Sequence, residues 1–183
     1  MTIFEQKKAL ESMVILVDTR EQQTDRAAKR YARFGCPYRR ATLSYGDYGY
    51  TCQLPSGRWL YDESATISCR AVVERKMNLD ELAACLGRDR ARFEREFLRA
   101  REAGARIFLL VENANWEKLI GGKYRSQMNP KALLASVAAW TIRYDLNLMF
   151  CREETSGILI REILYRDLKE RLERGELDDA GGD

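Results

Sequence analysis

Residues 71–80, Ala-Val-Val-Glu-Arg-Lys-Met-Asn-Leu-Asp, place three apolar residues directly before a charged triplet and the start of a helical pattern. The apolar run predicts a β-strand, in which successive side chains point to opposite faces. Glu74 and Lys76 should therefore project to one face and Arg75 to the other. A carboxylate and an ammonium group are thus expected side by side at the end of a strand.

This pairing suits metal-assisted cleavage of a phosphodiester. A carboxylate holds a hard cation such as Mg²⁺ through oxygen, and an ammonium group can orient or help deprotonate a water and offset charge on the phosphorane. A second carboxylate is needed, and Asp47 after Gly46 is the best candidate. It follows an alternating run, residues 40–44, that predicts a neighbouring strand. The pattern alone is weak, and turn chemistry remains the alternative for Asp47.

Three segments in order carry a resemblance to a known family. They are residues 14–21 (Val-Ile-Leu-Val-Asp-Thr-Arg-Glu), residues 43–48 (Leu-Ser-Tyr-Gly-Asp-Tyr) and residues 73–76, with Asp80 four residues further on. Over residues 13–150 their order and spacing resemble the motif series of the XPF-type structure-specific nucleases. The resemblance implies an α/β, restriction-endonuclease-like fold with a central mixed sheet flanked by helices. It also implies dependence on Mg²⁺ or Mn²⁺ and cleavage of branched, flap or fork DNA.

The acidic and lysine positions of the motifs carry over to this chain. The implied catalytic residues are Asp18, Asp47, Glu74, Lys76 and Asp80, with Asp18, Asp47 and Glu74 as metal ligands. The residues themselves leave two roles open. Asp18 ends a buried strand, where α/β sheets place their ligands, or it caps the next helix. Asp80 could hold Lys76, orient a water or cap its own helix.

Basic and aromatic residues near the motifs are candidates for binding DNA: Arg20, Arg75, Arg88, Arg92, Lys123, Tyr124 and Arg125. Arg20 and Arg75 are expected to fix carboxylates or touch phosphate. Arg88 and Arg92 begin an arginine stripe on a predicted helix over 78–104, and such a stripe is as readily a solvated face as a phosphate site. The residues at 123–125 lie in a loop that could touch phosphate or stack on a base; a plain surface loop is the simpler interpretation.

Composition excludes several classes of protein. The chain has 183 residues, 45% hydrophobic and 32% charged, which is typical of a globular protein. It has neither a membrane-spanning run nor a signal-peptide pattern, so we expect a cytoplasmic protein. Five cysteines without a Cys-x-x-Cys predict reduced thiols. The absence of histidine excludes Ser-His and Cys-His nucleophiles. No organic cofactor is expected, and a net charge of +3 permits a DNA partner.

The pattern divides the chain into an N-terminal segment (1–12), one nuclease domain (13–174) and an acidic flexible tail (175–183). A strand over 106–111 should lie beside the central strand and end at Glu112. Glu112 is a candidate for a further site carboxylate, although a strand-end acid that faces solvent is the simpler interpretation. Helices are expected over 129–144 and 156–174. Their apolar faces would serve the homodimer that the resemblance makes reasonable, although packing within the chain would use the same residues. The helix-hairpin-helix module of many relatives is not expected.

Two functions from different classes are compatible with these features. The first is a divalent-metal-dependent endodeoxyribonuclease. The alternative is a non-catalytic nucleic-acid-binding module, such as a subunit of a DNA repair or recombination complex. Acidic side chains kept close together are costly unless they serve a purpose, which favours the enzyme.

Overall fold

The computed structural model describes residues 1–61 and 65–178, so most of the expected tail lies outside the described residues. The helices are α1 (Ile3–Glu11), α2 (Asp25–Tyr31), α3 (Leu79–Leu86), α4 (Arg90–Glu102), α5 (Trp116–Ile120), α6 (Pro130–Tyr144) and α7 (Glu153–Glu173). The strands are β1 (Val14–Asp18), β2 (Tyr38–Ala41), β3 (Tyr48–Thr51), β4 (Ala71–Lys76), β5 (Arg106–Glu112) and β6 (Leu146–Cys151).

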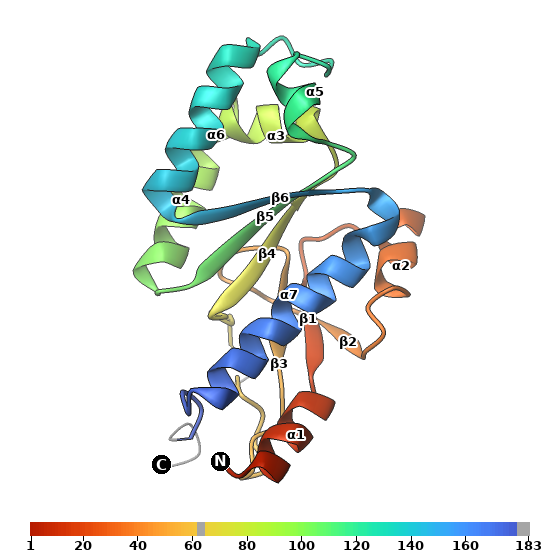
Figure 1. Cartoon of the computed structure of the whole chain (residues 1–183), viewed down its shortest axis with the longest axis vertical. Helices are drawn as coiled ribbons and strands as arrows, with labels where there is room; N and C mark the ends of the chain where they lie inside the picture. The colour runs from red at the N-terminus through yellow and green to blue at the C-terminus, as the bar shows by residue number, and fades with distance from the viewer. Residues whose placement is uncertain (62–64, 179–183) are drawn as a thin grey trace.

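All six strands join one mixed sheet in the order β2-β1-β3-β4-β5-β6. Strand β3 runs antiparallel to both of its neighbours, whereas the other pairs are parallel. Helices cover the sheet: α7 crosses one face, and α3, α4 and α6 lie on the other side (Figure 1). The predicted α/β fold with a central mixed sheet flanked by helices is confirmed.

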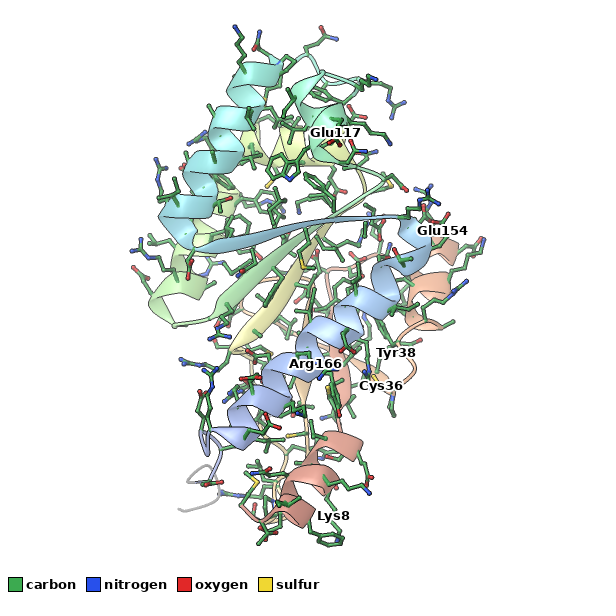
Figure 2. All side chains as sticks on the ribbon, in the orientation of Figure 1. Lys8, Cys36, Tyr38, Glu117, Glu154 and Arg166 are labelled. Atoms are coloured by element: carbon green, nitrogen blue, oxygen red, sulfur yellow. The ribbon has the colours of Figure 1, made fainter. Side chains whose placement is uncertain are left out.

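Both faces of the central strands are buried. Val72 packs on the α3, α4 and α6 side with Phe97 and Trp140, while Val73 packs on the other side with residues of α1, α2 and α7. Apolar side chains of α7 and of the sheet belong to one buried cluster, whereas Lys8 and Arg166 are exposed (Figure 2). Because both faces are covered, polar groups of the central strands reach solvent only at the strand ends.

Local sequence signals explain the helices that border the site. The side chain of Asn78 accepts a hydrogen bond from the Glu81 N–H and so caps α3. Gly87 follows the last residue of α3, and the helix predicted over 78–104 divides there into α3 and α4. The sequence did not indicate α5.

The strand predicted just before Asp47 does not lie beside the strand that carries Glu74. Residues 38–41 form β2, an edge strand paired with β1, and β3 is the strand that pairs with β4. Asp47 directly precedes β3. Since β3 runs antiparallel to β4, the start of β3 lies beside the carboxyl end of β4. This reversal of direction brings Asp47 to the charged triplet.

The described parts of both chain ends pack on the domain. Helix α1 begins with a capping box between Thr2 and Glu5 and packs against α7. Leu177 is buried, and the N-terminal ammonium of Met1 pairs with Asp178 at 2.6 Å. The apolar stripes of α6 and α7, which were considered for a homodimer, are buried within the chain: Leu133, Val137, Trp140, Ile160, Leu164, Leu168 and Leu172. Among the described helices, none combines the length and apolarity needed to cross a bilayer.

Candidate active site

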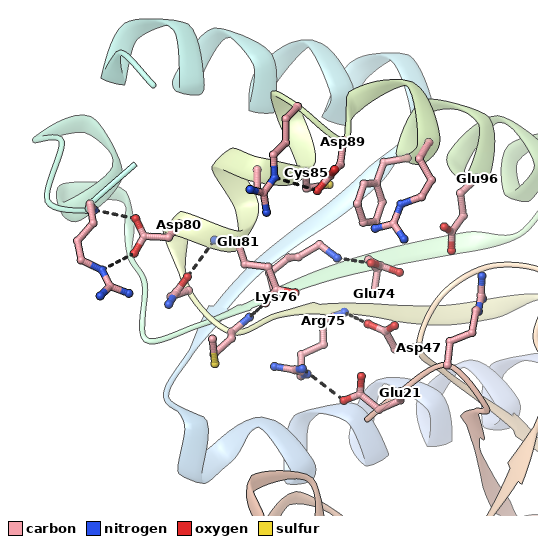
Figure 3. Close-up of a pocket in the computed structure, with 18 residues that line it drawn as sticks. Glu21, Asp47, Glu74, Arg75, Lys76, Asp80, Glu81, Cys85, Asp89 and Glu96 are labelled. Carbon is pink, nitrogen blue, oxygen red and sulfur yellow. Dashed lines mark hydrogen bonds and ion pairs between the residues drawn. The ribbon is translucent and has the colours of Figure 1, made fainter. Parts of the chain in front are cut away.

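Asp47 and Glu74 occupy opposed positions on neighbouring strands. Tyr48 is paired with Val73, and the Asp47 N–H donates to the Val73 carbonyl at 2.9 Å, so the next opposed pair is Asp47 and Glu74. Opposed residues share one sheet face, with their Cβ atoms about 4.5–5.5 Å apart. Both side chains line a cavity of about 480 Å³ (Figure 3).

Lys76 lies on the same face as Glu74, as the strand period predicted. Its ammonium is ion-paired with the Glu74 carboxylate and sits 4.3 Å from the centre of the Phe93 ring. Glu74 and Lys76 are each only 3% exposed. The amine is therefore held beside the carboxylates by an apolar ring below it and a carboxylate next to it.

Burial and like charge shift the pKa values of this group. Burial and the nearby Glu74 carboxylate raise the pKa of Asp47 to about 8. Burial also raises the pKa of Glu74, although Lys76 opposes this. For Lys76, burial acts to lower the pKa, but Glu74 and Asp47 outweigh it and raise the pKa. The amine therefore stays protonated over the physiological range.

These residues fit a divalent cation. The half-buried Asp47 and the buried Glu74 carboxylates lie side by side and repel each other, and a cation between them would relieve that repulsion. Within the part of the chain that the structure describes, no three acidic or cysteine side chains gather closely enough to hold a metal alone. Mg²⁺ commonly uses one or two carboxylates and takes its remaining ligands from waters and substrate phosphates.

Two hydrogen bonds fix the position of Asp47, one to its side chain and one from the residue before it. The Arg75 N–H donates to Asp47 Oδ2 at 2.7 Å. The preceding residue, Gly46, donates its N–H to Glu96 Oε1 at 2.9 Å. Glu96 comes from α4, lines the cavity and is 7% exposed. Helix α4 thus reaches across the sheet to hold the turn that carries Asp47.

Glu96 is a site residue that the sequence analysis missed. In the sequence it is one of several acidic residues interspersed among the arginines of this helix. Yet it lies three residues after Phe93 and next to Phe97, on the buried side of α4. A glutamate on the apolar stripe of an amphipathic helix is a signal for a buried carboxylate with a specific partner.

On the opposite face of the sheet, Arg75 enters a buried network of charges. Its guanidinium contacts Glu112 Oε2 and Glu21 Oε1, each at 3.3 Å. Arg30 bridges the same two carboxylates, at 3.1 Å to Glu112 and 3.3 Å to Glu21. The Tyr48 hydroxyl donates to Glu21 at 2.8 Å and accepts from Arg30 at 3.1 Å. The expectation that Glu112 faces solvent was wrong, because its side chain is buried between two arginines.

The structure does not bring Asp18 into the cavity. Its carboxylate is 1% exposed and accepts hydrogen bonds from the Leu43 N–H at 2.8 Å and the Arg20 Nε at 2.6 Å. Nor does it cap α2, since Thr24 does so. Arg20 does line the cavity and fixes this carboxylate, as expected.

Asp80 connects α3 to the loop predicted to bind DNA. Its Oδ1 accepts the Arg125 and Ser126 N–H groups at 2.7 Å each. Partial burial acts to raise the pKa of Asp80, but these hydrogen bonds outweigh it and lower the pKa. Asp80 therefore anchors the loop instead of holding Lys76 or capping its helix.

The predicted DNA-binding residues divide into two groups. The first group consists of the arginines that line the cavity: Arg20, Arg75, Arg88, Arg92 and Arg125. Lys123 is outside the lining. The Tyr124 ring packs against the core, and its hydroxyl donates to the Met128 carbonyl at 2.8 Å, which leaves it poorly placed to stack on a base.

Comparison with known proteins identifies the family of this chain. A family model described as the ERCC4 domain matches residues 17–161. The chain belongs to the ERCC4 domain family. No curated protein matches it.

Two solved structures resemble this ERCC4 domain. XPF from Aeropyrum pernix is 22% identical, with a TM-score of 0.56, and the match covers 91% of this chain and 67% of that one. The same protein in complex with DNA is also 22% identical, with a TM-score of 0.58, and the match covers 87% of this chain and 66% of that one. The likeness shows a shared restriction-endonuclease-like fold, and the ERCC4 domain spans about two thirds of the length of either structure.

The turn before Asp47 requires glycine for two reasons. Gly46 has φ +74°, and a Cβ there would lie 2.7 Å from Val72 Cβ in the core. We expect Gly46→Ala to destabilise the ERCC4 domain by about 3 kcal/mol. Gly57→Ala is the matched control, because Gly57 has φ +79° with nothing within 4 Å, so only about 1 kcal/mol of backbone strain is expected. Urea unfolding measures both, and equal losses would contradict the role of close packing.

The raised pKa of Asp47 predicts a pH dependence of stability in the absence of metal. The folded ERCC4 domain holds this proton more tightly than the unfolded chain, so the stabilising contribution is full below about pH 4 and is lost as pH rises through about 8. Asp47→Asn keeps an oxygen for the Arg75 N–H but cannot ionise. In EDTA it should be more stable than the unchanged protein at high pH, on the order of 2 kcal/mol, and this advantage should shrink toward about pH 5. Urea unfolding of both proteins across this pH range tests the prediction. A difference in unfolding free energy that does not change with pH would refute the titration of Asp47.

Proposed function

We propose that this protein is a divalent-metal-dependent endodeoxyribonuclease that hydrolyses phosphodiester bonds in branched, flap or fork DNA. The observation that carries the proposal is the opposed pair of Asp47 and Glu74 beside Lys76 in one cavity. Membership of the ERCC4 domain family, and the fold shared with an XPF nuclease whose structure includes DNA, support the substrate class.

Asp47 and Glu74 would hold Mg²⁺ or Mn²⁺, with water and phosphate oxygens as the other ligands. When bound, the cation would polarise the scissile phosphate and lower the pKa of the attacking water. Asp18 remains a weaker candidate ligand, because it does not line the cavity and its carboxylate already accepts hydrogen bonds from Arg20 and Leu43.

Lys76 would act as a fixed positive charge. Its raised pKa keeps the amine protonated, which disfavours a role as general base. A buried ammonium next to the carboxylates can orient the attacking water and stabilise the charge that builds on the phosphorane. The Glu74 carboxylate oxygens would be shared between the cation and the Lys76 amine. This would weaken the ion pair between Glu74 and Lys76 and let the amine face the substrate.

The arginines of the cavity would bind the DNA backbone. Arg88 lies in the turn between α3 and α4 and Arg92 lies on α4; both line the cavity and are exposed. Such contacts bring a salt-dependent affinity that does not depend on sequence. Arg75 serves a different purpose, because its guanidinium is committed to Glu21 and Glu112 and its N–H holds Asp47.

The experiment is a cleavage assay on labelled flap, fork, four-way and linear DNA with Mg²⁺, Mn²⁺ or EDTA. We expect nicking of branched DNA that requires a divalent cation and is abolished by EDTA. Binding to every substrate without cleavage under any metal condition would favour the alternative, a non-catalytic DNA-binding module. Cleavage that persists in EDTA would contradict the metal-dependent mechanism.

A further inference from the structure

Beside the active-site cavity lies a second cleft, formed by one side of α3 and by residues 125–128. We infer that this cleft receives one unpaired nucleotide of the DNA strand next to the phosphate that is cut. The inference rests on the proposed function and deepens it, since it names the feature of DNA structure that the domain would recognise.

The shape of the cleft follows from the small residues of α3. Ala83 and Ala84 lie three and four positions after Asp80, and Gly87 ends the helix one turn further on, so all four border the same side of α3. With no large side chain on this side, a space of about 570 Å³ remains between α3 and the loop. This volume is within the range of sites that bind small organic groups.

The opposite wall is fixed in place. Asp80 accepts N–H hydrogen bonds from both Arg125 and Ser126, and Tyr124 holds Met128 through its carbonyl. Gln127 lies between these anchored residues. The loop is therefore ordered before any ligand arrives, so binding does not have to supply the cost of ordering it.

The cleft is continuous with the active site. Asp80, Ala84, Arg88 and Arg125 line both the cleft and the cavity that contains Asp47 and Glu74. A strand whose phosphate lies at the carboxylates would meet the cleft at its next nucleotides. The two arginines stand at this junction with 81% and 90% of their side chains exposed.

The chemistry of the walls matches a nucleotide. Ala84 and Met128, both half-buried, offer an apolar surface, and a methionine sulfur packs well against an aromatic ring. Arg88 and Arg125 add positive charge at the mouth for the phosphate. A base inside a duplex is stacked on both faces, so it must be unpaired before it can lie on these walls. The cleft would therefore favour cutting next to unpaired DNA.

Photocrosslinking tests the inference without requiring cleavage. We would use the Glu74→Gln variant, fork DNA with one 5-iododeoxyuridine at successive positions around the branch, and Ca²⁺ as the cation. Trypsin would release residues 126–131, which include Met128 and do not line the active-site cavity. We expect one unpaired position to crosslink to this peptide, and the same base in duplex not to do so. Crosslinks confined to other peptides, with fork DNA bound, would overturn the inference.

Affinity measurements supply the second test. Met128→Ala and Arg125→Ala should each weaken binding of fork DNA by about fivefold, with linear duplex changed less than twofold. Arg125→Ala keeps the backbone N–H that Asp80 binds, so the loop should remain in place. The control is Lys7→Ala on α1, which lies at the far end of the molecule from α3 (Figure 1). Circular dichroism checks folding. Equal losses on fork and duplex would refute the inference, whereas a lack of cleavage by the unchanged protein would refute only the proposed function.

Discussion

Glu74→Gln is expected to slow DNA cleavage by about three orders of magnitude while DNA binding changes by less than about twofold. The amide has nearly the shape of the carboxylate but lacks the charge that holds a divalent cation. It also removes the partner that fixes the Lys76 amine. Two groups needed for the reaction are therefore disturbed by one isosteric change.

Single-turnover cleavage of fork DNA measures the rate, and fluorescence anisotropy in Ca²⁺ measures binding. The matched control is Glu117→Gln, which makes the same chemical change at an exposed residue of α5 (Figure 2). It should cleave like the unchanged protein. Full activity in Glu74→Gln would show that this carboxylate does not serve the reaction.

Glu112→Ala has the largest expected effect on stability. Glu112 is fully buried and pairs with Arg30 and Arg75, so its removal leaves two guanidinium groups with Glu21 as their remaining carboxylate partner in the network. Breaking a buried ion pair by removing one partner typically costs about 3–5 kcal/mol. We expect a loss of that size in the free energy of unfolding by urea.

Two further variants separate the cause from simple loss of packing. Glu154→Ala removes an exposed glutamate near the start of α7 and should change stability by less than about 0.5 kcal/mol. Replacing both members of one pair, Arg30→Met with Glu112→Leu, should recover part of the loss, since two apolar groups need no charge partner. If the double variant is less stable than Glu112→Ala alone, the uncompensated charge is not the main cause.

The strand period was enough to predict which way the residues of β4 point. Alternation placed Glu74 and Lys76 on one face and Arg75 on the other, and the ion pairs of all three agree with it. The motif identified Asp47 as a site residue. The motif could not predict which strand brings Asp47 beside Glu74, because the order and direction of strands depend on long-range pairing. The run at 40–44 suggested a strand beside β4, whereas β3 takes that place.

Residues whose roles depend on distant partners escaped prediction. Glu112 looks like a solvent-facing acid at the end of a strand until α2 brings Arg30 to it. Glu96 looks like one of many charges on α4 until the Gly46 turn reaches it. Tyr124 lies in a loop whose composition suggested stacking on a base, but its ring packs against the hydrophobic core. In each case the local pattern was compatible with two environments, and tertiary packing decided between them.

The most direct test of the account is the position of Mn²⁺ in crystals of this protein soaked with the ion, read from its anomalous scattering. We predict one ion with an Asp47 oxygen and a Glu74 oxygen each about 2.1–2.3 Å away, and loss of that ion in Asp47→Asn. An ion bound elsewhere in the cavity, or density that contacts only one of the two carboxylates, would contradict the claim that these two strands share a metal.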